Sequence, residues 1–339
     1  MDKIKVIVVD DSAFMRMIIA EIIESSDKFK VVAKLRNGKE LLEKVEYYKP
    51  DVITLDIEMP ELDGLETLKE LKKRQYNYPI IMLSSMDDSR KTMQCLELGA
   101  VDFIKKPTDI KNQSEETRES ITEKIYEIID SNKIKVNNRS IKRCNKIISN
   151  KIDAVVIGAS TGGPKALQEV LTKIDRSICK PIFVVQHMPK GFTKAFAERL
   201  NRICDLNVVE AEDNMEIKGN TIYIAQGGYH MTVGNGRYIK LNEEPSIWGV
   251  RPAVDKLFES AVKVYNGNLL SVILTGMGKD GAKGTALIKD AGGVTIAEDQ
   301  STCTIYGMPK AAYETGKVDM VLPLNEVGIN IMKIAKGRN

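Results

Sequence analysis

Short runs of valine and isoleucine alternate with amphipathic stretches along almost the whole chain. Runs that are apolar at successive positions are typical of strands buried on both faces, and the stretches between them repeat apolar residues with helical spacing. Strand and helix in alternation predict a parallel sheet with right-handed crossovers. Because 339 residues exceed the usual size of one domain, we expect an α/β protein with two doubly wound parallel-sheet domains joined by a linker.

The first alternating series covers residues 1–125. Its expected strands are residues 4–9, 31–33, 52–55, 80–83 and 101–104. Its expected helices are residues 13–25, 39–48, 64–74, 90–98 and 115–130. Residues 126–152 then hold the end of the last helix and a basic linker, because residues 133–151 carry seven lysines and arginines and no acidic residue. A solvated linker is one interpretation of this run, and a docking patch for an acidic surface is the other.

The second alternating series covers residues 153–339 and predicts another α/β domain. Its expected strands are residues 154–157, 182–185, 207–210, 221–224, 269–274, 294–297 and 320–322. Its expected helices are residues 164–173, 193–202, 252–265, 282–291 and 310–315. We expect residues 333–339 to form a solvated tail.

Charge and cysteine content exclude several classes of protein. The chain has 50 lysines and arginines against 47 acidic residues, and this near balance excludes a generally basic nucleic-acid-binding protein. Its five cysteines are scattered and never form a C-x-x-C pair, so neither a disulfide framework nor a thiolate metal site is indicated. No segment resembles a signal peptide or reaches the ~20 apolar residues of a membrane span. We therefore expect a cytoplasmic protein that does not insert into membranes.

Polar residues stand at the ends of the expected strands in the first half. Asp10 and Asp11 end the first strand, Asp56 ends the third, Ser84 ends the fourth, and Lys106 follows the fifth. Ligands of open α/β sheets bind beyond the carboxyl ends of the strands. Three carboxylates that meet there repel one another unless a hard cation lies among them, and oxygen ligands suit Mg²⁺. The hydroxyl and the ammonium group at the same edge can hold phosphoryl oxygens.

The second half offers a nucleophile and a base at equivalent places. Ser160 lies in a G-x-S-x-G turn between a strand and a helix, which is typical of a serine nucleophile but also of a dinucleotide-phosphate loop. His187 ends the next strand, where a dinucleotide site needs an acidic residue, so it favours a serine hydrolase in which it takes the serine proton. Asp280 follows the strand at 269–274, where it can orient the imidazole or cap the helix at 282–291.

Two further residues can line the same cleft. His230 follows a strand in a glycine-containing loop and is either a second site residue or a structural histidine. Arg251 opens a helix, where it can bind a substrate carboxylate or lie on the surface.

Residues 1–125 resemble a response-regulator receiver domain, which is flavodoxin-like, on the strand-end residues described above. The resemblance implies that Asp56 is the phosphoacceptor and that Asp10 and Asp11 join it in binding Mg²⁺. It also implies that Ser84 is the switch hydroxyl and that Lys106 contacts the phosphoryl group.

Phe103 takes the aromatic switch position of that family, but it lacks a hydroxyl, and plain core filling is its alternative role. An aspartyl phosphate adds charge and strong acceptors, and movement of the hydroxyl and the ammonium group onto them would bias a two-state surface.

Residues 153–339 resemble the Rossmann-like catalytic domain of the chemotaxis protein-glutamate methylesterase family, CheB. The motifs G-A-S-T-G-G, V-Q-H-M-P, R-P-x-x-D and G-M-G-x-D-G occur in that order. The family's P-G-x-x-H-M loop differs here because Gln226 replaces the proline. The resemblance implies no cofactor in this domain.

The implied reaction is hydrolysis of glutamate γ-methyl esters on chemoreceptors, with release of methanol and, in some relatives, deamidation of glutamine. Ser160 attacks, His187 transfers the proton, and Asp280 orients the imidazole. The backbone amides at Thr161 and Met277 are our candidates for the oxyanion hole.

The combination of domains implies regulation and partners. The chemotaxis histidine kinase would phosphorylate the receiver, which covers the catalytic cleft when unphosphorylated, and methylated chemoreceptors would be the substrates. No nucleic acid is expected as a partner. Three alternatives remain: a receiver-controlled serine hydrolase with another acyl substrate, a regulator that binds nucleotide or DNA without catalysis, and an inactive esterase.

Overall fold

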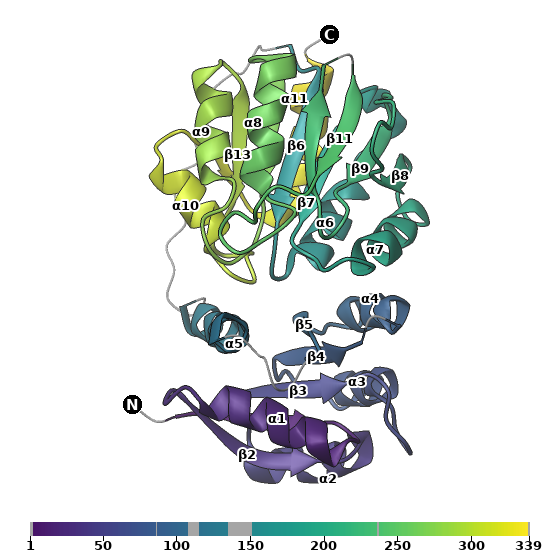
Figure 1. Ribbon diagram of the computed structural model, residues 1–339, viewed down its shortest axis with the longest axis vertical. Coiled ribbons are helices and arrows are strands. Elements are labelled where there is room, and N and C mark those ends of the chain that lie inside the picture. The colour runs from purple at the N-terminus through teal and green to yellow at the C-terminus, as the bar shows by residue number, and fades with distance from the viewer. Residues whose placement is uncertain (1–2, 86, 108–114, 135–150, 236, 338–339) are drawn as a thin grey trace. The chain divides into compact units, whose positions relative to one another are not determined.

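The computed structural model describes residues 3–85, 87–107, 115–134, 151–235 and 237–337. The chain divides into two compact units, Met1–Lys133 and Ile134–Asn339. Most of the expected basic linker lies outside the described residues, and the expected domain limits at residues 125 and 153 stay predictions. Each unit is an α/β structure with a parallel sheet between helices, which confirms the predicted fold class (Figure 1).

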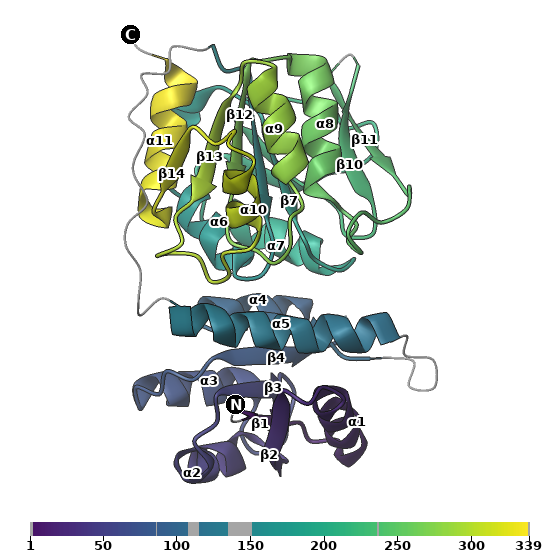
Figure 2. The same ribbon diagram turned by 90° about the vertical axis from the view of Figure 1, so that its left-hand side faces the viewer.

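The first unit contains a five-stranded parallel sheet in the order β2-β1-β3-β4-β5. Its strands are β1 (Ile4–Val9), β2 (Phe29–Leu35), β3 (Val52–Asp56), β4 (Ile80–Ser84) and β5 (Asp102–Lys105). Its helices are α1 (Ala13–Glu24), α2 (Gly38–Tyr48), α3 (Gly64–Lys73), α4 (Ser89–Glu97) and α5 (Glu115–Ile134). Helices α1 and α2 lie on opposite sides of this sheet (Figure 2).

The strand order places two sequence-distant strand ends side by side. The chain reverses its direction of travel across the sheet at β1, which pairs with both β2 and β3. Val9 at the end of β1 lies opposite Leu55 near the end of β3. The residues that follow, Asp10 and Asp56, therefore meet at this topological switch point, where open α/β sheets bind their ligands.

The second unit contains a seven-stranded parallel sheet in the order β14-β13-β12-β6-β7-β9-β8. Its strands are β6 (Ala154–Ala159), β7 (Ile182–Gln186), β8 (Asn207–Glu210), β9 (Thr221–Ile224), β12 (Leu269–Ile273), β13 (Val294–Glu298) and β14 (Met320–Leu322). Its helices are α6 (Gly163–Leu171), α7 (Phe192–Asn201), α8 (Val254–Tyr265), α9 (Ala282–Asp290), α10 (Met308–Glu314) and α11 (Leu324–Lys336), with a 3-10 turn, η2 (Arg176–Ile178).

The central strands β12, β6 and β7 bring three loops to one edge of the second sheet. Ile273 of β12 pairs with Gly158 of β6, and Ala159 of β6 pairs with Gln186 of β7. The ladder continues one step further, because the His187 amide donates to the Ala159 carbonyl at 3.1 Å. The loops that leave these strands carry Ser160, His187 and Asp280.

A hairpin and the last helix differ from the sequence predictions. An antiparallel hairpin, β10 (His230–Gly234) and β11 (Tyr238–Asn242), packs against α8. The predicted solvated tail from residue 333 is wrong for the described residues, because α11 runs to Lys336 and buries Ala335. Leu324, Val327 and Ile331 recur with helical spacing on the buried side of α11, and this pattern extends the helix to its end.

No helix in the described part of the chain has the length and apolar character needed to cross a membrane. The expected cytoplasmic location stays a prediction.

Candidate functional site

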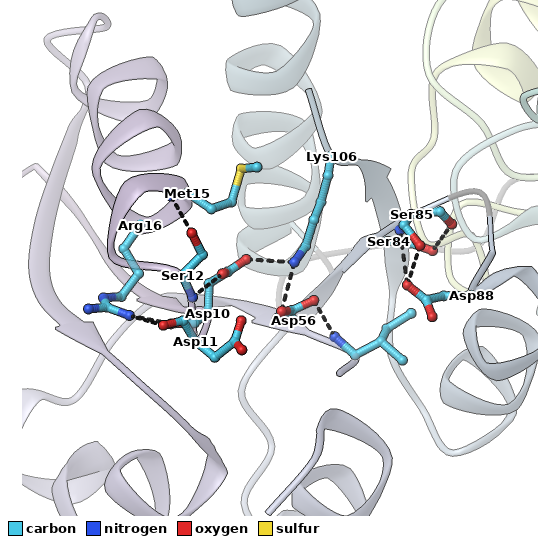
Figure 3. Close-up of polar contacts among 11 residues, drawn as sticks. Asp10, Asp11, Ser12, Met15, Arg16, Asp56, Ser84, Ser85, Asp88 and Lys106 are labelled. Carbon is cyan, nitrogen blue, oxygen red and sulfur yellow. Dashed lines mark hydrogen bonds and ion pairs between the residues drawn. The ribbon is translucent and has the colours of Figure 1, made fainter. Parts of the chain in front are cut away.

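The first unit gathers a lysine and three carboxylates at the carboxyl edge of its sheet, after strands β1, β3 and β5 (Figure 3). Carboxylate oxygens of Asp10, Asp11 and Asp56 lie within 4.8 Å of one another, with Asp11 exposed and the other two buried. The Lys106 Nζ lies 2.8 Å from Asp10 Oδ2 and 2.7 Å from Asp56 Oδ2. The structure therefore brings together four of the five residues that the sequence placed at this edge.

Electrostatics at this cluster favour an added cation. Burial raises the pKa of Asp56 to about 6, although its hydrogen bond with Lys106 acts in the opposite direction. Burial alone would lower the pKa of Lys106, but its hydrogen bonds with Asp10 and Asp56 outweigh that effect and raise it. One ammonium group thus pairs with two of the three carboxylates, and oxygen ligands of this number and hardness fit Mg²⁺.

The two expected switch residues have other partners in this structure. The buried Ser84 hydroxyl is hydrogen bonded to the Thr92 hydroxyl of α4 at 2.6 Å and donates to the Ser85 carbonyl at 3.0 Å. Phe103 is buried in β5, and its carbonyl accepts a 2.9 Å hydrogen bond from Lys124 of α5. Their switch roles stay predictions.

The turn between β6 and α6 is shaped by close contacts at its two adjacent glycines. Gly162 has a φ of 76°, and a Cβ there would lie 2.3 Å from the Thr304 hydroxyl. A Cβ at Gly163 would lie 2.0 Å from Gln186 Oε1. The space beside both glycines is thus filled by protein side chains, which disfavours a pyrophosphate-binding loop. The turn instead holds Ser160 at the carboxyl end of the central strand.

His187 and Asp280 form a buried pair at the same edge of the sheet. The imidazole Nε2 lies 2.9 Å from Asp280 Oδ2, and the aspartate side chain is only 2% exposed. Burial alone would raise the pKa of Asp280, but hydrogen bonds from His187 and from the amides of Val254 and Asp255 hold it below its usual value. The carboxylate stays ionised, and the Nδ1 of His187 remains as the ring atom for another partner.

Asp280 is not the helix cap that was the alternative to a catalytic role. The N-cap of α9 is Gly281, which has no side chain. Asp280 instead accepts hydrogen bonds from the first two amides of α8, at 2.6 Å from Val254 N and 2.9 Å from Asp255 N.

Gln186 connects the turn and the histidine, a role that the sequence analysis did not assign. Its buried Nε2 donates to the Ser160 carbonyl at 3.0 Å and to the His187 carbonyl at 3.2 Å. Its place directly before the strand-end histidine, in a run of apolar residues, was the available signal, because a buried polar side chain normally has hydrogen-bond partners.

The two amides expected to form an oxyanion hole are unused as donors within the described residues. Neither the Thr161 nor the Met277 backbone N–H donates a hydrogen bond there. The Met277 loop lies directly against the serine turn, because a Cβ at Gly276 would stand 2.7 Å from the Ser160 Cβ. Their role stays a prediction.

His230 and Arg251 both bind backbone groups nearby. His230 is fully buried at the start of β10, where its Nδ1 accepts from the Ala253 amide at 3.2 Å and its Nε2 pairs with the Pro245 carbonyl at 3.1 Å. Burial lowers its pKa, which favours the neutral ring that an accepting Nδ1 requires. The Arg251 guanidinium donates to the carbonyls of Glu243 and Glu244. Both arrangements fit structural roles, and the cleft roles stay predictions.

Comparisons with known proteins match both units. Residues 155–331 match the family model described as CheB methylesterase, and residues 6–117 match the response regulator receiver domain. A Clostridium acetobutylicum protein named protein-glutamate methylesterase/protein-glutamine glutaminase is 51% identical over 342 residues, with 99% of each chain covered. A protein of that name from Archaeoglobus fulgidus is 42% identical, with 97% of each chain covered.

A solved structure supports the assignment of the second unit. The crystal structure of the Thermotoga maritima CheB methylesterase catalytic domain is 44% identical, with a TM-score of 0.52, and the match covers 54% of this chain and 98% of that one. The resemblance inferred from the sequence motifs is confirmed, and the chain belongs to the CheB methylesterase family, with a response regulator receiver domain at its N-terminal end.

Proposed function

We propose that this protein hydrolyses glutamate γ-methyl esters on methyl-accepting chemotaxis receptors, with Ser160, His187 and Asp280 as its catalytic residues. The observation that carries the proposal is the 2.9 Å contact between His187 and Asp280 at the strand ends beside the Ser160 turn. The names of the relatives, which are protein-glutamate methylesterases, support the substrate class.

The proposed reaction uses the Nδ1 atom of His187, because its Nε2 atom contacts Asp280. The Ser160 hydroxyl attacks the ester carbonyl while His187 Nδ1 takes its proton, and the ionised Asp280 stabilises the imidazolium through Nε2. The amides of Thr161 and Met277 donate to the oxyanion of the tetrahedral intermediate, an interaction worth several kcal/mol in such sites. The intermediate collapses as the imidazolium protonates the departing methanol. Water activated by the same histidine then hydrolyses the acyl-enzyme and releases glutamate.

The same site can deamidate glutamine. In that reaction ammonia leaves in place of methanol, and the acyl-enzyme that forms is the same. The second half of the relatives' names, protein-glutamine glutaminase, supports this activity.

The receiver unit regulates the esterase through phosphorylation of Asp56 by the chemotaxis histidine kinase. Asp10, Asp11 and Asp56 would hold Mg²⁺, which supplies positive charge to the phosphoryl oxygens when bound. Lys106, whose Nζ lies 2.7 Å from Asp56 Oδ2, would contact the phosphoryl group. Ser84 leaves its hydrogen bond with Thr92 to reach a phosphoryl oxygen, and this exchange links phosphorylation to the position of α4.

The direct test uses receptor membranes that carry labelled methyl esters. We expect the full-length protein to release labelled methanol, and to do so faster with Mg²⁺ and a small phosphodonor. The Ser160→Ala variant is the matched control. Release no faster than with that variant would contradict the proposal, while hydrolysis of small esters alone would indicate another acyl substrate.

A further inference from the structure

Helices α8 and α9 begin without a capping side chain from their own N-cap residues. The N-cap of α8 is Ala253 and that of α9 is Gly281. The first amides of a helix have no acceptor within the helix, and a buried helix end needs acceptors from elsewhere. In this unit each helix obtains its acceptor from the segment that starts the other.

Two buried aspartates supply these acceptors in a reciprocal arrangement. Asp280, two residues before α9, accepts from the amides of Val254 and Asp255 at the start of α8. Asp255, the second residue of α8, accepts from the Gly284 amide of α9 at 2.7 Å. Displacement of either helix end would therefore break hydrogen bonds at both.

The reciprocal cap is joined directly to the histidine. Asp280 Oδ2, which lies 2.6 Å from the Val254 amide, is also the atom that lies 2.9 Å from His187 Nε2. A shift of the α8 start relative to the α9 start would move this oxygen, and catalysis is sensitive to displacements on the order of 1 Å.

Close packing of the two helices keeps this geometry. A Cβ at Gly284 would stand 2.4 Å from the Phe258 Cβ of α8. The glycine therefore lets α9 approach α8 closely enough for its amide to reach Asp255.

Packing alone does not require a carboxylate at this buried position, because an apolar side chain could fill the same space. Asp255 is 5% exposed, and burial, together with the nearby charge of Asp280, raises its pKa to about 6. The other charged groups that face it are Glu259 of α8 and Lys283 of α9, which form an ion pair at 2.8 Å. The helix N-termini that both aspartates face favour negative charge.

We propose that Asp255 is a positioning residue for the Asp280–His187 pair: it caps α9 and thereby fixes the segment from which Asp280 reaches the imidazole. This inference rests on the proposed catalytic roles of Ser160, His187 and Asp280. Among the described residues no hydrogen bond or ion pair joins Asp255 to His187, so it acts through the position of Asp280.

The test compares kcat and KM of Asp255→Ala with those of the full-length native protein on a methyl ester substrate. We expect kcat to fall about 10–100-fold with KM nearly unchanged, because a displaced imidazole slows chemistry but leaves binding intact. Asp255→Asn keeps an oxygen that can accept from Gly284, so we expect it to restore kcat to within a few fold. If Asp255→Ala does not fold, Asp255→Glu replaces it, since the longer side chain misplaces the accepting oxygen while keeping its charge.

Asp319→Ala is the matched control. Asp319 is also a buried aspartate of this unit, and it accepts from the Thr295 amide and pairs with Lys289. We expect this variant to lose stability and keep its kcat. The chain has two histidines, so the imidazole NMR signal of His187 can be followed in each variant. It should shift in Asp255→Ala and stay in place in Asp319→Ala.

A double-mutant cycle separates positioning from a general structural role. On an Asp280→Ala background, Asp255→Ala should cause no further loss of kcat, because the residue it acts through is absent. Two results would overturn this inference and leave the proposed catalytic roles standing. One is a double variant in which the two losses of kcat multiply independently. The other is a folded Asp255→Ala protein with native kcat and an unmoved His187 signal. Native kcat in Asp280→Ala would overturn the proposed catalytic roles and this inference with them.

Discussion

Asp56 ends strand β3 and Asp280 lies in the loop that follows strand β12, and both are buried, yet their pKa values shift in opposite directions. Burial raises the pKa of Asp56 to about 6 despite the Lys106 ammonium group. The pKa of Asp280 is lowered, although burial acts on it in the same way. The difference lies in the surroundings: Asp56 shares one lysine with Asp10, whereas Asp280 accepts from an imidazole and two helix amides.

The comparison shows that the donors around a buried carboxylate determine its chemistry. The charge of Asp280 is satisfied by the protein itself, so it can orient a histidine permanently. The cluster around Asp56 carries more negative charge than its lysine balances, so it suits a divalent cation and a phosphoryl group. The surroundings of Asp280 thus suit a lasting contact with a histidine, and those of Asp56 suit modification.

The largest expected effect concerns Ser160, the proposed nucleophile of the second unit. We expect Ser160→Ala to lower methanol release by about 10⁴-fold or more, as removal of a nucleophile does in serine hydrolases. The control is Ser177→Ala, which changes an exposed serine of η2 and should retain full activity. Substantial methanol release by the Ser160 variant would show that another group attacks the ester.

Loss of the proposed Mg²⁺ ion or of the proposed phosphoacceptor, Asp56, should affect only the first site. We expect chelation of Mg²⁺ or the Asp56→Asn change to abolish phosphorylation and its stimulation of the esterase, while basal methanol release stays unchanged. Incorporation of phosphate from a labelled phosphodonor and the rate of methanol release measure the two effects. Chelation that also stops basal hydrolysis would contradict the separation of the two sites.

The pH dependence of stability extends the comparison to Asp255, whose pKa burial raises to about 6. Between about pH 4 and 6 the folded protein holds a proton that the unfolded chain has released, so this contribution to stability is present at low pH and is lost as pH rises. The unfolding free energy of the native protein minus that of Asp255→Asn should fall by up to about 3 kcal/mol over this range. Denaturant titrations at a series of pH values measure it, and a constant difference would contradict the shift.

The smallest expected effect concerns Gln186. Gln186→Leu removes the two hydrogen bonds that hold the Ser160 and His187 carbonyls, and we expect kcat to fall about 5–10-fold, as for the loss of about 1 kcal/mol of hydrogen bonding. Gln186→Glu should be worse, because it places a carboxylate against two carbonyl oxygens. An unchanged kcat in both folded variants would show that the hydrogen bonds of Gln186 to the Ser160 and His187 carbonyls do not affect the reaction.

The sequence predicted the alternation of strands and helices because strands buried on both faces leave a strong apolar pattern. It also predicted the residues at strand ends, since parallel strands bring those ends to one edge. The β10–β11 hairpin was missed because its five-residue strands carry a glycine and a buried histidine that resemble loop residues. The end of α11 was predicted as a solvated tail because its last turn carries Lys333 and Lys336.

Gln186 and Asp255 escaped prediction for another reason. Their roles depend on hydrogen bonds with segments that are distant in sequence, Gln186 with the Ser160 turn and Asp255 with Gly284. For Asp280 the sequence predicted contact with the imidazole, but it did not predict the hydrogen bonds from the first two amides of α8. Such reciprocal contacts have no local signature.

The most direct test of the account is covalent labelling of Ser160 by a fluorophosphonate, mapped by mass spectrometry of the full-length protein. We expect a single modified serine at position 160, with labelling that becomes at least about tenfold slower in His187→Ala and Asp280→Asn, because both remove activation of the hydroxyl. Modification of a different serine, or labelling of Ser160 at the native rate in both variants, would contradict a nucleophile activated by this histidine and aspartate.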